Sequence, residues 1–434
     1  MDKSLVGWLS IPVFFVLAAL GIPVAVVLAI VAIVGFAVIG GFEPSLSLAG
    51  MVLYAKTATY TFSVLPMFIL MGNIAFYSGF ARDFFDAASK WVGGLKMGIA
   101  YAAMIAYAIF SAASGSSIAA CATMAKIVAP EFERAGYNKR LAFGVITAGA
   151  TLDPLIPPSL LMVIYGIIAG ESIAKLLIAG IMPGLTLAGI FMLLIFIMGR
   201  INPQLVALSN PTVTWKARFS SLGNVWPIVA IIVIALGGIY TGVFTPTEGG
   251  AVGAFAALVL ALVSCRMGVK QLQESLIETV KTTSSIFIII ATAFVFAHFI
   301  AVTRLPYQVS EFMASLQVPR LAILTGIIIF YLILGCLMDM IAAMFITLPI
   351  LLPSIIGLGY HPIWFGVIMV QLCVIALLTP PYGLNLFTIK AVLPSAGMRD
   401  IIWGTLPFVG ASIANLWLLV AFPQIALFLP SFMK

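Results

Sequence analysis

Apolar residues fill most of the chain in stretches long enough to cross a membrane, and polar residues are confined to short intervals between them. A spanning helix needs about 20 mostly apolar residues. Single stretches of at least roughly that length are 51–79, 173–199, 223–247, 249–265, 284–303 and 403–430. Residues 5–40 contain Gly21 and Pro23 and are too long for one straight helix, so they form either one bent helix or two short ones. The pattern predicts an all-helical, polytopic membrane protein.

The composition excludes most other classes of protein. Of the 434 residues, 63% are hydrophobic and 8% are charged, whereas a soluble domain keeps about 25% of its residues charged. The sequence has no GxxxxGKS/T phosphate loop, and its four cysteines and two histidines are too few and too scattered for a transition-metal site. We predict that the chain is not an enzyme, and that an ion gradient or a partner supplies its energy.

Three further apolar stretches are interrupted by residues that break helices. Residues 98–130 carry SAASGSS at their middle, 141–169 carry DPLIPPS, and 363–392 carry TPPYG. Because lipid offers no hydrogen bonds, backbone that leaves the helix at membrane depth must be buried in protein or line a watery cavity. In transporters, interrupted segments at matching positions of two halves indicate the binding site.

The two halves of this chain do match. GYNKRLAFGVI begins at Gly136 and GYHPIWFGVI at Gly359, and the same interval separates Pro157 of IPPS from Pro380 of TPPY. The apolar run before each motif has a small or polar break, which is SAASGSS in the first half and GCLMDM within 320–357 in the second. We therefore expect a duplication in which a helical hairpin is followed by a broken helix.

Basic residues indicate how the halves are oriented. They cluster in the loops 80–97, 134–140, 200–218 and 266–281, and positive loops lie in the cytoplasm. All four loops lie on one side of the membrane only if 98–130 is a re-entrant hairpin. Because of the spans that follow it, the second hairpin opens from the opposite face of the membrane. Two oppositely oriented re-entrant hairpins with two broken helices form an inverted-topology repeat, which favours a transporter with alternating access.

This topology divides the chain into five parts. We expect N-terminal scaffold helices in 1–90, a first repeat half in 91–200, central scaffold helices and cytoplasmic loops in 201–283, a second repeat half in 284–400 and a C-terminal scaffold helix in 401–434. The hairpins and broken helices are 98–130 and 141–169 in the first half, and 320–357 and 363–392 in the second.

Uncharged residues at the breaks can bind a cation. Serine hydroxyls are hard oxygen ligands, and Pro154, Pro157 and Pro158 remove amide donors and leave carbonyls unpaired. In the second half, TPPYGLN offers Thr379 as a hydroxyl ligand and Asn385 as a substrate contact. The alternative is that small residues only pack helices closely and prolines only bend them. A prolyl break at the same place in both halves favours an ion site.

Ionisable residues at membrane depth are few, and each is a functional candidate. Asp153 precedes the first prolyl break and Asp339 lies in the second hairpin, where either can bind a cation, accept a proton or orient a ligand. Ser116 and Ser117, at the tip of the first hairpin, join Asp339 as candidate substrate contacts. Glu248 of TPTEGG lies between two spans and is either functional or a cap.

Five motifs resemble the large membrane subunit of TRAP transporters, the DctM-like family, over almost the whole chain: SGSSIAACATMAKIVAPEFERAGY, LIPPSLLMVIYG, AGIMPGL, GVFTPTEGGAVGA and LLTPPYGLNLF. The resemblance implies Na⁺-driven import of an organic acid by an elevator movement, without an organic cofactor. It implies a multi-pass protein of the bacterial inner membrane, with a small DctQ-like membrane subunit as a separate chain and a periplasmic substrate-binding protein. Dicarboxylates, keto acids, sialic acid and sugar acids are substrates of the family.

The family's sodium sites carry over residue by residue. The resemblance implies a first site from Ser111, Ser114 and the carbonyls around Asp153, Ile156 and Pro158, and a second from Gly335, Ala376, Thr379 and Tyr382. The family usually has glycine where Asp153 and Ala376 stand. Because a carboxylate at Asp153 can strengthen Na⁺ binding or let a proton replace it, the coupling ion is left open between Na⁺ and H⁺.

Three other functions remain as alternatives. A stand-alone ion-coupled dicarboxylate carrier would transport without a binding protein, and a channel would conduct without saturation. A membrane enzyme acting on lipid would need clustered histidines or acids at the interface, and the sequence has no such cluster.

Overall fold

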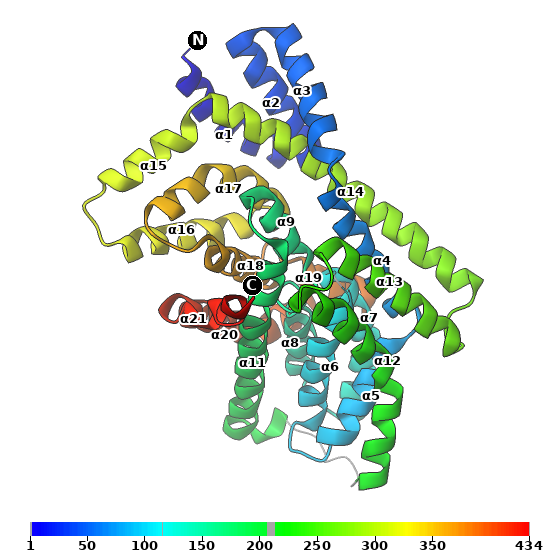
Figure 1. Cartoon of the computed structure of the whole chain (residues 1–434). Coiled ribbons are helices and arrows are strands. Elements are labelled where there is room, and N and C mark those ends of the chain that lie inside the picture. The colour runs from blue at the N-terminus through cyan, green and yellow to red at the C-terminus, as the bar shows by residue number, and fades with distance from the viewer. Residues whose placement is uncertain (1, 115, 206–212, 434) are drawn as a thin grey trace.

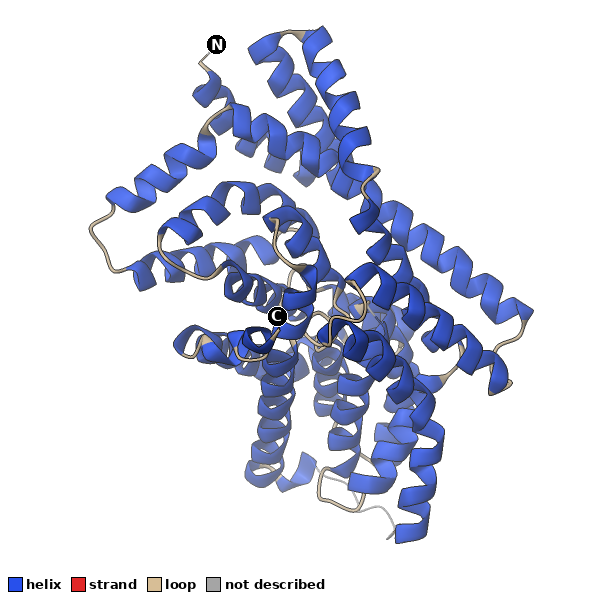
Figure 2. Cartoon of the chain, viewed as in Figure 1, coloured by secondary structure: helices blue, strands red, loops and turns tan. Residues whose placement is uncertain are grey.

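The computed structural model describes residues 2–114, 116–205 and 213–433, and within these ranges every regular element is a helix (Figure 2). The N-terminal part has α1 (Lys3–Ala19), α2 (Val24–Gly40), α3 (Phe42–Thr57), η1 (Tyr60–Ser63), α4 (Val64–Tyr77) and α5 (Phe80–Val92). The next part has α6 (Gly98–Ser114), α7 (Ser117–Arg134), α8 (Lys139–Ala150), α9 (Leu160–Ala169), α10 (Ile173–Ala179) and α11 (Ile181–Ile201).

The rest of the described chain is also helical. Its middle has η2 (Pro203–Leu205), α12 (Trp215–Tyr240), α13 (Pro246–Val263), α14 (Val269–Val302) and α15 (Leu305–Ser315). It ends with α16 (Arg320–Gly335), α17 (Met340–Gly357), α18 (Pro362–Leu378), α19 (Leu384–Val392), α20 (Met398–Ala421), α21 (Gln424–Leu427) and η3 (Pro430–Phe432). The long helix α14 runs across the molecule and packs against α2, α3, α4 and α17 (Figure 1).

Several helices are long and apolar enough to cross a membrane, as the hydrophobic pattern predicts. By length and composition, the described ranges contain seven: Tyr60–Tyr77, Ile173–Ile201, Trp215–Tyr240, Pro246–Val263, Val269–Val302, Met340–Gly357 and Met398–Ala421. The all-helical class is confirmed.

Two predicted segments are divided where the local sequence opposes a continuous helix. The first stretch forms the two helices α1 and α2, because Gly21 adopts a left-handed φ of +80° and Pro23 follows it. The expected single span 51–79 is wrong, since α3 ends at Thr57 and α4 begins at Val64. Between them, the Thr59 hydroxyl donates to the Ala55 and Lys56 carbonyls, a local bond that competes with the helix.

The predicted loop 266–281 is also wrong, because most of it is the first half of α14. The helix starts after Gly268, whose N–H donates to the Gln271 side chain at 3.1 Å. The residues that follow, VKQLQESLIETVK, are mostly good helix formers. The basic residues therefore lie on a helix that extends beyond the apolar stretch.

The predicted duplication is visible in the helix boundaries. Helix α7 runs from Ser117 to Arg134 and α17 from Met340 to Gly357, so the two helices are equally long and are separated by the same interval as the paired sequence motifs. Both halves also carry a cis peptide bond within the break, at Pro157–Pro158 and Pro380–Pro381.

The halves differ in the length of the first arm of the broken helix. Helix α8 ends at Ala150, whereas its counterpart α18 continues to Leu378. Pro154 explains the early end, because it has no N–H to donate to the Ala150 carbonyl. The corresponding residue of the second half is Leu377, which keeps its N–H.

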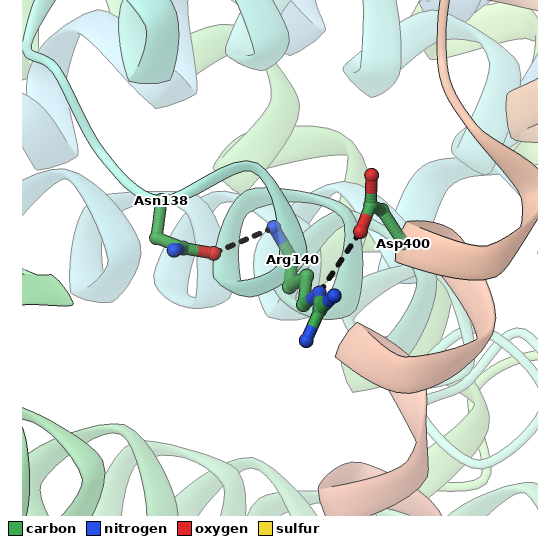
Figure 3. A network of polar contacts seen from close by, with 3 residues as sticks. All are labelled: Asn138, Arg140 and Asp400. Atoms are coloured by element: carbon green, nitrogen blue, oxygen red, sulfur yellow. Dashed lines mark hydrogen bonds and ion pairs between the residues drawn. The ribbon is translucent and has the colours of Figure 1, made fainter.

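Helix α20 packs closely against α8. A Cβ on Gly404 would lie 1.9 Å from the carbonyl oxygen of Arg140, and a Cβ on Gly144 would lie 2.1 Å from that of Gly404. At the end of the contact, Arg140 Nε donates to Asp400 Oδ1 at 2.9 Å while the Arg140 backbone N–H donates to Asn138 (Figure 3). The two backbones therefore touch, and glycine is required at both positions.

A buried polar network ties α20 to α18 and α11. Gln371 Nε2 donates to the Ser412 carbonyl, and Asn415 Nδ2 donates to Gln371 Oε1, both at 3.0 Å. Thr186 of α11 donates to Asn415 Oδ1 at 3.0 Å. Gln371, Ser412 and Asn415 are fully buried. These bonds fix the relative positions of three apolar helices, which hydrophobic contact alone would not define.

Candidate functional site

A cavity of about 240 Å³ lies where the two hairpin tips meet the two helix breaks. Its walls come from the start of α7, the first break and the start of α9, the turn before α17, the second break, and α14. The lining residues are Ser116, Ser117, Ile118, Asp153, Pro154, Leu160, Leu161, Thr282, Ile286, Met338, Asp339, Met340, Ile341, Cys373, Ala376, Leu377, Tyr382 and Leu384. Segments from opposite halves of the chain therefore share one small space, as the duplication predicts.

A chain of hydrogen bonds joins the first hairpin to both broken helices. The Ser117 hydroxyl donates to the Ala150 carbonyl at 2.7 Å, and Asn385 Nδ2 donates to the Ser117 oxygen at 3.1 Å. Ala150 has the carbonyl that Pro154 leaves without a helical partner, so Ser117 supplies the missing donor. Asn385 is fully buried, and its Oδ1 has no donor among the described residues.

The second helix of each hairpin begins at the cavity, and each has a different N-cap. Ser116 caps α7 by accepting from the Ala119 N–H at 3.4 Å. At the equivalent position, Asp339 caps α17 by accepting from the N–H groups of Ile341 and Ala342 at 3.0 and 3.3 Å. The N-terminus of α17 is thus already capped by a carboxyl group, whereas that of α7 is capped only by a serine hydroxyl.

The residues of the predicted first sodium site are partly described. Ser111 is fully buried, and its hydroxyl has no partner in the part of the chain that the structure describes. The side chain of Ser114 lies outside the described part of the chain. Asp153 is buried and lines the cavity. Within the described ranges the carbonyls of Ile156 and Pro158 accept no hydrogen bond, so they remain available to a cation.

The predicted second site is compact. A Cβ on Gly335 would lie 2.6 Å from the Cβ of Ala376, so the hairpin end and the broken helix touch. The Thr379 hydroxyl donates to the Ile375 carbonyl at 2.7 Å, which leaves its oxygen lone pairs free for a cation. Ala376 and Tyr382 line the cavity, whereas Gly335 and Thr379 are not among its lining residues.

The contribution of α14 to the cavity was not predicted from the sequence. Thr282 and Ile286 line the cavity from that helix, and the Thr283 hydroxyl is buried without a partner in the described ranges. The polar run TTSS at 282–285, at the start of an apolar stretch, is the only signal that could have indicated it. Glu248 lies elsewhere and completes a capping box with Thr245.

The oxygen-rich donor set fits an alkali cation better than a transition metal. Across the described ranges, no three His, Cys, Asp or Glu side chains are grouped to hold a metal ion. The available atoms are hydroxyl, carbonyl and carboxylate oxygens, which are the ligands of hard cations.

Comparison with known proteins connects this architecture to one family. Residues 11–425 match the family model described as the tripartite ATP-independent periplasmic transporter, DctM component. The C4-dicarboxylate TRAP transporter large permease protein DctM of Pseudomonas aeruginosa is 35% identical over 88% of this chain and 88% of its own. The 2,3-diketo-L-gulonate large permease protein YiaN of Escherichia coli is 34% identical over 81% of this chain and 82% of its own.

Solved structures share the fold at much lower identity. The Alcanivorax borkumensis YdaH transporter superposes with a TM-score of 0.60 at 13% identity, covering 88% of this chain and 90% of that one. Neisseria gonorrhoeae MtrF gives a TM-score of 0.56 at 11% identity over 89% of this chain and 84% of that one.

Proposed function

The chain belongs to the DctM family of tripartite ATP-independent periplasmic transporters, and from that premise we propose that it imports an organic acid, coupled to Na⁺, through the cavity between its hairpin tips. It is a multi-pass membrane transport permease rather than an enzyme, and large permeases of this kind work with a small membrane subunit and a periplasmic binding protein. The observation that carries the proposal is the convergence of both tips and both breaks on one cavity.

The polarity of the cavity supports an organic acid as the substrate. Helix α7 directs its N-terminus at the cavity with only Ser116 as cap, so an anionic group is favoured there. The carboxylate of Asp339 makes the opposite tip less suitable for an anion. Two relatives are named for C4-dicarboxylate and 2,3-diketo-L-gulonate, which are acids. We propose that a substrate carboxylate binds at the N-terminus of α7, at Ser116 and the backbone of Ser117, because the Ser117 hydroxyl already donates to the Ala150 carbonyl.

Sodium coupling rests on the two oxygen-lined breaks. The buried hydroxyl of Ser111 supports the first site, together with the carbonyls of Ile156 and Pro158, which no donor of the described ranges reaches. The close approach of Gly335 to Ala376 and the oxygen lone pairs of the Thr379 hydroxyl support the second. An ion at either place would join a hairpin tip to a broken helix and so stabilise a closed cavity, which links ion binding to substrate capture.

Movement of the sites across the membrane is proposed to occur as an elevator. In this proposal, hairpins α6–α7 and α16–α17 are re-entrant from opposite faces and move with α8, α9, α18 and α19. Helix α20 packs against α8 and bonds to α18, which favours its moving with them rather than serving as a scaffold helix. Helices α1–α4 and α12–α14 form the stationary part in the bacterial inner membrane.

The small subunit is proposed to be a separate chain. The isethionate TRAP transporter permease protein DctMQ of Oleidesulfovibrio alaskensis is 28% identical over 96% of this chain but only 65% of its own length. That relative is therefore longer than this chain and carries both components in its name, and co-purification of this chain with a separately encoded small subunit tests the proposal.

Uptake into proteoliposomes tests the function as a whole. The permease would be reconstituted with its small subunit, and labelled organic acids offered with or without the binding protein, under an inward Na⁺ or H⁺ gradient. Accumulation that requires both the binding protein and Na⁺ is the expected result. Accumulation without a binding protein would instead identify a stand-alone carrier, and non-saturating flux a channel.

The variant Asp153→Asn distinguishes Na⁺ from H⁺ as the coupling ion. If H⁺ alone drives uptake, Asp153→Asn should abolish the drive while leaving substrate exchange intact, and the sodium proposal fails. If Na⁺ drives uptake, Asp153→Asn should retain a Na⁺ requirement.

A further inference from the structure

A second cavity, with no lining residue in common with the transport site, lies between the α5–α6 loop, α6 and α11. It has a volume of about 580 Å³. The lining residues are Val92, Leu95, Lys96, Met97, Tyr101, Ile105, Met192, Phe196, Gly199 and Arg200. None of them belongs to the hairpin tips or the breaks, so the transport mechanism leaves this cavity without a role.

The cavity combines an apolar floor with two cations. Most of its lining is aliphatic or aromatic, whereas Lys96 and Arg200 are both exposed. Within the described part of the chain neither forms an ion pair, and no Asp or Glu lines the cavity. The Arg200 guanidinium lies 5.1 Å from the Phe196 ring centroid, which holds it at the apolar edge. Two such cations beside an apolar floor fit an amphiphile with an anionic head.

The cavity also opens toward the surface that faces lipid. Arg200 ends the apolar segment Ile173–Ile201, one of the helical segments able to span a membrane, so its charge lies at headgroup level. Next to the cavity, α11 exposes Leu193, Phe196 and Ile197, by 56%, 48% and 42%. An acyl chain could therefore pass from the bilayer onto the floor without crossing a polar surface.

We propose that this cavity binds one anionic phospholipid, with the phosphate between Lys96 and Arg200 and an acyl chain over Ile105 and Met192. Basic pockets between membrane helices recognise anionic headgroups by charge, and the aliphatic floor adds the contribution of buried methylene groups. The loop is already fixed to α11, since a Cβ on Gly199 would lie 2.8 Å from Met97 Cγ. A bound lipid would strengthen this connection.

Lipid titration of the purified permease in detergent tests the proposal. Phosphatidylglycerol and phosphatidylcholine would each be titrated and binding followed by native mass spectrometry. The wild type should bind phosphatidylglycerol preferentially. The variant K96Q/R200Q should bind it about 30-fold more weakly, since each basic side chain near the surface contributes about fivefold to the attraction. Both side chains are exposed, so melting temperature in phosphatidylcholine nanodiscs should stay unchanged and exclude misfolding.

Control measurements separate this site from general attraction. The variant K139Q/K270Q removes two exposed cations from other positions and should retain wild-type affinity. Met192→Trp fills the floor and should weaken phosphatidylglycerol binding with both cations intact. Unchanged affinity in K96Q/R200Q, or an equal loss in K139Q/K270Q, would overturn the proposal. Equal affinity for glycerol phosphate would also overturn it, because a phosphate site would need no acyl chain.

Discussion

At the scale of single residues, one proline organises the first half of the site. Pro154 ends α8 and leaves the Ala150 carbonyl to Ser117, which in turn accepts from Asn385. The sequence predicted that Ser117 and Asn385 belong to the site, because serines, prolines and an amide at membrane depth are costly unless used. Their hydrogen bond could not be predicted, since it joins residues from opposite halves of the chain.

The hydrogen bond between Ser117 and Asn385 predicts that the effects of substituting the two residues on stability are not additive. Ser117→Ala leaves a buried carbonyl without a donor, which costs about 1–3 kcal/mol of stability, and Asn385→Ala removes the bond from the other side. The double variant should be less destabilised than the sum, by about 0.6 kcal/mol, the average for hydrogen bonds within membranes. Thermal unfolding in detergent measures all three. Strict additivity would show that the bond contributes nothing.

The proposed sodium ligands predict a change in ion dependence. Ser114→Ala and Thr379→Ala each remove a hydroxyl oxygen, so the Na⁺ concentration for half-maximal uptake should rise about tenfold, which corresponds to about 1.4 kcal/mol. Thr325→Ala is the matched control, because its hydroxyl also donates to a carbonyl one helical turn earlier, at 2.8 Å, but is exposed. Unchanged Na⁺ activation in both site variants would remove the assignment.

At the scale of elements, the positions of the breaks were predictable and the ends of the helices were not. Prolines and glycines fix where the chain must leave the helix, and they did so at both breaks. The polar residues 269–281 contain helix formers that carry α14 past its apolar stretch, so charge alone wrongly indicated a loop. The apolar stretch 51–79 is divided after α3, where the Thr59 hydroxyl bonds to the last turn of that helix.

The contact of α8 with α20 predicts a strong steric effect. Gly404→Ala would place a Cβ 1.9 Å from a backbone oxygen, and the required helix shift should cost about 3 kcal/mol, the upper range for overpacking. Gly410→Ala, on the same helix with nothing within 4 Å, should be neutral. Melting temperatures of the two variants give the comparison. A Gly404→Ala protein as stable as Gly410→Ala would contradict the close packing.

At the scale of the whole molecule, the repeat was the most informative feature of the sequence. Its constant interval predicts which helices correspond, and the boundaries of α7 and α17 agree with it. The asymmetry between the halves was harder to foresee. Asp339 and Ser116 are equivalent caps with different functional groups, so the serine-capped tip suits an anion better than the tip capped by a carboxyl group.

Labelling from each side of the membrane tests whether this cavity faces the two sides in turn. Ile118 lines the cavity and is 45% exposed, so Ile118→Cys would be made in a chain whose four cysteines are replaced by alanine. An impermeant maleimide would be applied to spheroplasts and to inverted vesicles, with Lys270→Cys as a control that reacts from one side. We expect Ile118→Cys to react from both sides. Addition of Na⁺ and substrate should raise the rate from one side and lower the rate from the other. Reaction from one side under every condition would contradict this expectation.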